Sequence, residues 1–300
     1  MNMNTAPDLA QRQAITTYVN RFSTLLREPI PLPDISQTTA APGNVDRTRP
    51  LALIVSPHPD DECLTGGLAL RLRQEAGFEV LNVAATLGSK ASRRSERWNE
   101  LCHACDRLGF ALLDPVFEGR EPITPARRHA DPAGWTRDVD RLAGLFEDYR
   151  PRIVFCPHER DGSATHIGVH WLVRDALQRH AHAVWLAQTE FWGTLGHPNT
   201  LVELDNSSVV TLIEALTCHH GEIARSPYHL RLMSWLADSV RRGGEAVFGA
   251  GTQPPSFAFG SLYRLERWAD GRQTAVGCPR AIAAEDSLQP LFDEEILSRA

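Results

Sequence analysis

The feature that most constrains the fold of this chain is the alternation, from Leu51 to Thr189, of short apolar segments with longer amphipathic ones. The short segments have the length and apolar content of buried strands, at residues 51–56, 80–86, 152–156 and 183–189. The longer segments have helical spacing, at residues 63–76, 94–108, 135–149 and 166–178. Repeated strand–helix–strand units favour right-handed crossovers and a sheet covered on both faces. The sequence therefore predicts an α/β fold, a Rossmann-like three-layer α/β/α architecture with a mainly parallel sheet.

The segment before this alternation has a different character. Residues 8–27 are predicted as a helix, and the prolines that follow, from Pro29 to Pro42, cannot continue it. We interpret residues 1–45 as a helical arm with a proline-rich connector, laid across a single α/β domain formed by residues 46–300.

Beyond about residue 200 the periodicity weakens. The pattern there predicts helices at 209–219 and 229–242 and a late strand at 257–268. Gly243 and Gly244, together with later glycines and prolines up to Pro255, predict a long loop between the second of these helices and the strand.

Composition excludes several classes of protein. With 300 residues, 42% hydrophobic residues and a formal net charge of −6, the chain is not disordered throughout, and no nucleic-acid partner is expected. No run approaches the roughly 18–20 apolar residues of a membrane span. Residues 1–10 lack the basic start and apolar core of a signal peptide. The six cysteines include one C-x-x-C pair, Cys102 and Cys105, on a predicted helix, so we expect free thiols in a cytoplasmic protein.

The most informative segment directly follows the first predicted strand. It reads Ser-Pro-His-Pro-Asp-Asp-Glu and places His58, Asp60, Asp61 and Glu62 within five residues. Three acidic groups crowded beside an imidazole repel one another unless a cation lies among them. An acidic turn that caps the next helix is the alternative, but a cap needs one acid and not three. The loop therefore predicts a metal site at the carboxyl end of a strand, where parallel sheets form their sites.

A second polar cluster follows the third predicted strand. It runs from Pro157 to His170 and includes Asp161, His166 and His170. In a doubly wound sheet this loop can lie beside the first one. His166 and His170 are four residues apart and share a helix face, so either or both are candidate ligands, with chance spacing as the alternative.

These loops resemble those of the PIG-L/LmbE-like zinc-dependent N-deacetylases over roughly residues 50–225. The resemblance rests on P-H-P-D-D-E after a strand, with support from Thr86-Leu-Gly88, from Arg97-Trp-Asn-Glu-Leu101 and from the helix that ends at His219. It implies one zinc ion per chain and hydrolysis of an N-acetyl or other N-acyl group from an amino sugar or sugar conjugate. The partner expected is thus a small N-acylated molecule.

The resemblance also implies roles for individual residues. His58 and Asp61 match two zinc ligands, and His166 matches the third at the end of the D-G-x-x-x-H pattern. Asp60 matches the general base that acts on the metal-activated water. Arg97 is a candidate substrate-binding residue, with a structural salt bridge to Glu100 or another acid as the alternative.

The chain departs from the family pattern at Ser163, where the family has a histidine that supports the tetrahedral intermediate. His170 or His219 could supply that role, or the protein could bind metal or ligand without turnover. A deacylase of a non-sugar metabolite is a further alternative. The sequence leaves assembly into a homo-oligomer open. Nucleotide binding is disfavoured because neither G-x-G-x-x-G nor a P-loop motif follows the strands.

Three smaller assignments complete the expectations. Glu62 is expected to orient its loop or to start the following helix rather than to bind metal. Asp161 is, by its proximity, a candidate to hold the ring of a ligating histidine. The basic run from Lys90 to Arg97 is either solvated or recognises an anionic substrate. Tryptophans suited to stacking on a sugar, with burial in the core as the alternative, are Trp171, Trp185 and Trp192.

Overall fold

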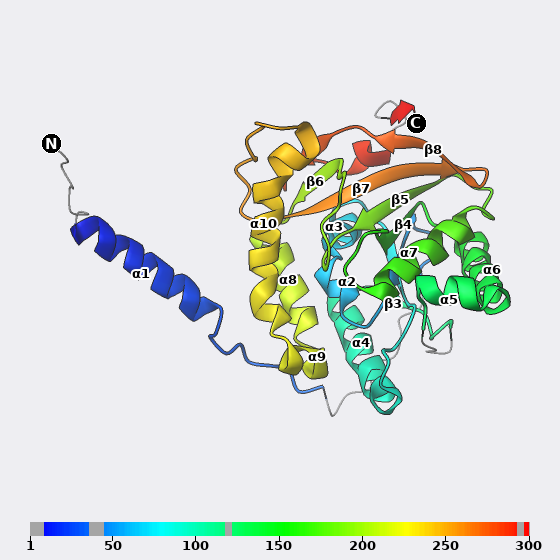
Figure 1. The fold of residues 1–300 in the computed structure, drawn as a ribbon, viewed down its shortest axis with the longest axis horizontal. Helices are drawn as coiled ribbons and strands as arrows, with labels where there is room; N and C mark the ends of the chain where they lie inside the picture. Colours follow the sequence, from blue (N-terminus) through cyan, green and yellow to red (C-terminus); the bar gives the residue numbers. More distant parts are fainter. Residues whose placement is uncertain (1–8, 36–44, 118–121, 293–296, 300) are drawn as a thin grey trace.

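The computed structural model describes residues 9–35, 45–117, 122–292 and 297–299, and shows an α/β fold built around one mixed sheet (Figure 1). Five parallel strands lie in the order β3-β2-β1-β4-β5. Their bounds are β1 Leu51–Ser56, β2 Glu79–Ala84, β3 Ala111–Leu112, β4 Ile153–Pro157 and β5 Val184–Thr189. The parallel part of the predicted sheet is therefore confirmed.

The sheet continues past β5 with antiparallel strands. β7 (Gly260–Ala269) pairs with β5, β8 (Arg272–Gly277) with β7, and β10 (Leu297–Arg299) with β8. Off this path, β6 (Thr200–Glu203) pairs with β7 and with β9 (Arg280–Ile282). Only β7 of these was expected. The others are short or carry polar residues at alternate positions, so their apolar signal is weak.

Helices cover both faces of the sheet, which confirms the three-layer architecture (Figure 1). One face packs on helices α2 Asp61–Leu64, α3 Gly67–Glu75, α4 Arg94–Leu108, α8 Asn206–Leu216 and α10 Tyr228–Phe248. The other packs on α6 Pro132–Tyr149 and α7 Ala164–Leu177, with α5 Pro125–Ala130 packed on these two helices. Along β1, Ala52 and Ile54 join the first core, whereas Leu53 and Val55 join the second. A strand buried on both faces needs such an unbroken apolar run.

Two glycine positions explain where helix predictions differ from the structure. The predicted helix 63–76 is divided into α2 and α3, and a Cβ at Gly66 would stand 2.0 Å from the carbonyl oxygen of Glu62. The predicted loop at Gly243–Gly244 is wrong, because both residues lie inside α10. A Cβ at Gly243 would meet the side chain of Leu201 at 2.7 Å, so close packing rather than a turn requires glycine there.

The N-terminal helix is present as α1 (Leu9–Leu25), but it does not lie across the domain as the sequence suggested. It buries none of its residues and projects from the rest of the molecule (Figure 1). Its side chains Leu9 and Tyr18 are 82% and 71% exposed. Beyond the helix, Ile35 is buried in the first core. Among the described residues, no helix combines the length and the apolarity that crossing a membrane requires.

Candidate metal centre and active site

The two loops singled out in the sequence lie side by side, because β1 and β4 are parallel neighbours in the sheet. The first loop leaves β1 after Ser56 and leads into α2. The second leaves β4 after Pro157 and leads into α7. Both loops are therefore at the carboxyl edge of the strands, where open α/β sheets place their ligands.

His58, Asp61 and His166 form a group that could hold a metal ion. Oδ2 of Asp61 lies 3.6 Å from Nδ1 of His58 and 3.4 Å from Nε2 of His166. Ligand atoms at zinc-bonding distance in a tetrahedron stand about 3.3 Å apart, so a zinc ion fits between these atoms. Nε2 of His166 is buried and has no hydrogen-bond partner among the described residues, which leaves it available to a metal.

Neighbouring groups orient the candidate ligands. The backbone N–H of His58 donates to Oδ2 of Asp61 at 2.9 Å, which ties the two ends of the first loop together. Oδ2 of Asp161 lies 3.5 Å from Nδ1 of His166, and Oδ1 of Asp161 accepts from the N–H of Ser163 at 2.9 Å. Asp161 therefore has the place expected of the group that fixes the imidazole of a metal ligand.

Burial and neighbouring charges shift the pKa values of this group. Burial opposes the charged form of His166, but Asp61 and Asp161 outweigh it and raise the pKa of His166 to about 10. Burial also acts on Asp61, yet His166 and His58 hold its pKa well below the usual range. Burial, followed by the charge of Asp61, raises the pKa of Asp60 well above its ordinary value. A divalent cation supplies the same positive charge, so metal binding and loss of the His166 proton are coupled.

A second group of possible ligands consists of Glu62, Cys63 and His219. Its members are already bonded to one another: Nε2 of His219 lies 2.6 Å from Oε1 of Glu62, and Sγ of Cys63 lies 3.2 Å from the same oxygen. The first separation is that of a direct hydrogen bond. The polar atoms of this group therefore already bond directly to one another. Glu62 thus makes its contacts within the protein, in the first turn of α2.

A cavity of about 580 Å³ opens beside the metal group. It is lined by His58, Asp60, Asp61, Gly88, Ser89, Arg97, Gly162, Ser163, Thr165, Trp192, Glu222, Arg225, Ser226 and Tyr228. The first loop supplies one end of the cavity, and α9 (His220–Arg225) with the start of α10 supplies a wall. The volume suits a sugar-sized molecule.

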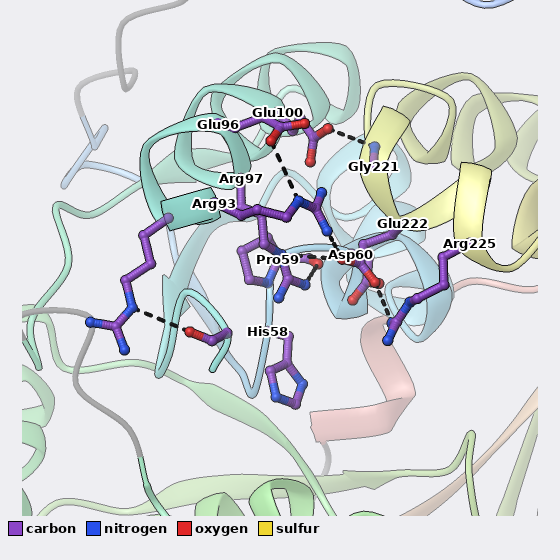
Figure 2. A network of polar contacts seen from close by, with 12 residues as sticks. His58, Pro59, Asp60, Arg93, Glu96, Arg97, Glu100, Gly221, Glu222 and Arg225 are labelled. Carbon is purple, nitrogen blue, oxygen red and sulfur yellow. Dashed lines mark hydrogen bonds and ion pairs between the residues drawn. The ribbon is translucent and has the colours of Figure 1, made fainter. Parts of the chain in front are cut away.

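Arg97 lines this cavity, but its polar contacts are within the protein. Nη2 of Arg97 donates to the carbonyl oxygen of Pro59 at 2.9 Å, and Nε lies 3.6 Å from Oε1 of Glu222 (Figure 2). Its ion-pair partner is therefore Glu222, as the alternative of a salt bridge to Glu100 or another acid allowed, and Glu100 instead accepts from the N–H of Gly221 at 2.8 Å. Within the basic run, Nη1 of Arg93 pairs with Glu222 at 3.1 Å and Nε of Arg94 donates to the carbonyl oxygen of Gly88 at 3.2 Å, whereas Lys90 is exposed.

The two histidines considered as replacements for the one missing at Ser163, His170 and His219, do not line the cavity. His170 is buried, and its Nδ1 lies 3.0 Å from the carbonyl oxygen of Pro157. His219 is buried against Glu62. Neither is among the cavity-lining residues of the described chain, whereas Ser163 is.

Of the three tryptophans, only Trp192 lines the cavity, and its side chain is 49% exposed. Its ring meets that of Tyr228 edge-on, with 5.7 Å between centroids. Trp185 is buried and Trp171 packs against the second core, as the alternative predicted. Sequence reasoning missed Glu222, Arg225 and Tyr228, because no motif marks them and their helices lie about 160 residues beyond the metal loop. The expected free thiols are observed at all six cysteines.

Comparison with known proteins relates part of this chain to deacetylases. The family described as "PIG-L: GlcNAc-PI de-N-acetylase" matches residues 53–177. The 1D-myo-inositol 2-acetamido-2-deoxy-alpha-D-glucopyranoside deacetylase of Mycobacterium leprae is 28% identical over 155 residues, which are 43% of this chain and 50% of that protein. The chain spans about half the length of the curated relatives it matches.

Solved structures share the fold. N,N'-diacetylchitobiose deacetylase from Pyrococcus horikoshii has a TM-score of 0.52 at 17% identity, with 83% of this chain and 92% of that chain covered. The zinc-inhibited form of teicoplanin deacetylase Orf2 has a TM-score of 0.53 at 15% identity, with 73% and 99% covered. Over residues 53–177 the chain is therefore similar to the PIG-L family of de-N-acetylases, and the candidate ligands His58, Asp61 and His166 all lie within that segment.

Proposed function

We propose that the protein is a zinc-dependent hydrolase that removes an N-acetyl group from an amino sugar or sugar conjugate. The observation that carries the proposal is the group of His58, Asp61 and His166, spaced for a tetrahedral metal, two of whose members, His58 and Asp61, line a sugar-sized cavity. Two imidazoles and one carboxylate leave a coordination position for water or substrate, which is typical of catalytic rather than structural zinc.

In this proposal, His58, Asp61 and His166 hold the zinc ion. Zinc in such a site polarises the amide carbonyl and lowers the pKa of water towards about 7. Asp60 takes the proton at its carboxylate as the water oxygen attacks the carbonyl carbon. The C–N bond then breaks, and Asp60 returns the proton to the leaving amine, so that acetate and a free amino sugar result. General acid–base help of this kind contributes roughly 10²–10⁴-fold.

The cavity walls support a sugar-like substrate. Trp192 and Tyr228 present aromatic surface, and the side chains of Ser89, Thr165 and Ser226 supply hydroxyl groups along the lining. Carbohydrates bind to this combination through stacking and hydrogen bonds. The substrates named for relatives, an acetamido-glucopyranosyl inositol and diacetylchitobiose, are therefore the first to test.

The test is acetate release by the zinc-loaded protein from a panel of N-acetylated sugars, their inositol conjugates and non-sugar N-acetyl amines. We expect release from sugar substrates and a loss of at least about 10²-fold in the Asp60→Asn variant, with zinc content unchanged. Release from non-sugar amines alone would assign a different substrate class. Retained zinc with no release from any substrate, in wild type and variant alike, would make the protein a binding protein without turnover.

A further inference from the structure

We propose that Arg97, Glu62 and His219 are positioning residues that hold the peptide between Pro59 and Asp60 and thereby aim the Asp60 carboxylate into the cavity. The proposal rests on the proposed function in one respect, that Asp60 is the base of the reaction. It assigns to Arg97 a task different from the substrate binding expected from the sequence.

The backbone of Asp60 has a conformation that needs an external hold. Its φ is 119° and its ψ is −26°, in the region that residues with a side chain rarely adopt. Asp60 is also 7% exposed, so the surrounding protein rather than solvent determines this conformation. Strain of this kind persists only where neighbouring contacts over-determine it, and it is characteristic of functional sites.

Two charged side chains form hydrogen bonds to opposite ends of the peptide unit between Pro59 and Asp60. Its carbonyl oxygen, that of Pro59, accepts from Nη2 of Arg97 at 2.9 Å. Its N–H, that of Asp60, donates to Oε2 of Glu62 at 2.9 Å. Because the peptide unit is planar, these two hydrogen bonds together fix its rotation. They therefore also fix the direction in which the side chain of Asp60 projects from the backbone.

Each of the two side chains is itself held. Glu62 is fully buried, and its other oxygen lies 2.6 Å from Nε2 of His219. Nδ1 of His219 is buried with no hydrogen-bond partner among the described residues, which indicates that Nε2 carries the proton donated to Glu62. The arrangement gives the buried carboxylate a donor on each oxygen, as such a group requires.

Arg97 is held through Glu222, which is 3.6 Å from its Nε and also pairs with Arg93 at 3.1 Å and with Arg225 (Figure 2). The backbone carbonyl of His219 accepts from the N–H of Glu222 at 3.1 Å. The partner of Glu62, which is His219, and the partner of Arg97, which is Glu222, are therefore both held at the start of α9. The cavity wall and the base are thus parts of one hydrogen-bonded unit.

The experiment compares Glu62→Met, His219→Phe and Arg97→Met with wild type in three measurements: kcat and KM for acetate release, zinc per chain, and the φ of Asp60 in crystal structures. We expect kcat to fall about 10²-fold, as small misplacements of a catalytic group do. We expect KM to stay within about threefold, zinc to be retained, and the φ of Asp60 to become negative.

Matched controls separate positioning from general destabilisation. His180→Phe removes a buried histidine whose Nδ1 lies 2.8 Å from Glu147, and Arg73→Met removes an arginine 3.4 Å from Glu79; both lie outside the cavity lining. These variants should keep kcat within about threefold of wild type. Glu62→Gln keeps an oxygen that can accept from the Asp60 N–H, so its kcat should lie between those of wild type and Glu62→Met.

The proposal is overturned if the φ of Asp60 stays positive in Arg97→Met and Glu62→Met while kcat matches the controls. A rise of KM alone in Arg97→Met, with φ and kcat preserved, would make Arg97 a substrate-binding residue instead. Failure of the proposed function is a separate result, because it would appear as no acetate release by wild type. The crystal structures would then still decide whether these side chains hold the Asp60 backbone, and Glu62→Gln would serve if Glu62→Met did not fold.

Discussion

At the scale of single residues, His166 is the side chain that joins the second loop to the metal group. His58 and Asp61 come from one loop, so His166 alone brings a ligand from the end of β4. We predict that His166→Ala reduces zinc from about one ion per chain to near zero after dialysis, because two protein ligands bind zinc far more weakly than three. His170→Gln is the control and should keep its zinc. Zinc retained by His166→Ala but lost by His170→Gln would place the third ligand at residue 170.

His170 also predicts a pH dependence of stability. Burial lowers the pKa of His170 to about 4. Between pH 6.5 and 4, His170 therefore stays neutral in the native state, whereas in the unfolded chain, with a pKa near 6.5, it takes up a proton. The unfolded state therefore binds more protons, and this contribution to the free energy of unfolding is complete above pH 6.5 and is lost as the pH falls towards 4. We expect the wild type to lose about 2–3 kcal/mol more than His170→Gln across that window in urea unfolding. Equal slopes in the two proteins would contradict the burial argument.

At the scale of elements, α1 buries no residue and projects from the rest of the molecule. We predict that a chain beginning at Ile30, which keeps the buried Ile35, melts within about 2 °C of the full chain and releases acetate at the same rate. Ile35→Ala in the full chain is the comparison and should cost about 2 kcal/mol, since it removes buried side-chain volume. A large loss of stability on truncation would mean that α1 packs on the domain or on another chain.

The sequence predicted elements well where local signals decide them. Residues 94–108 were predicted as a helix and form α4 over the same span, because Gly109 ends it in the left-handed region with a φ of 68°. The division of α2 from α3 and the glycines inside α10 depend instead on contacts between distant segments, such as Gly243 with Leu201. Local periodicity carries no information about such approaches.

The same distinction applies to the site. The metal group could be found because His58 and Asp61 are adjacent in a motif and His166 follows a neighbouring strand. Glu222 and Tyr228 could not, because only the packing of α9 and α10 brings them to the cavity. The partner of Arg97 depends on the same long-range packing, which is why the sequence could not single out Glu222 among the acids.

At the scale of the whole molecule, Arg71 connects the central layer to the later part of the chain. It is 1% exposed, and its guanidinium donates to the carbonyl oxygens of Glu203 and Ala284 at 3.0 Å each. We predict that Arg71→Leu costs about 3 kcal/mol, because buried acceptors are left without donors, and lowers the melting temperature by about 6 °C. Arg231→Leu, an exposed position on α10, is the control and should change little. Equal melting temperatures would show that solvent reaches these carbonyls.

Different segments of the chain supply the candidate metal group and the wall of the cavity, and this separation bears on how substrate preference can change by substitution. The atoms that would perform the hydrolysis come from loops after β1 and β4, whereas Trp192, Tyr228 and Arg225 come from the chain beyond β5. Substitutions in the later segment can therefore alter the shape and charge offered to a substrate while the metal group stays intact. Laboratory evolution for a new acylated substrate should accordingly concentrate on residues 192 and 225–228 and spare the two loops.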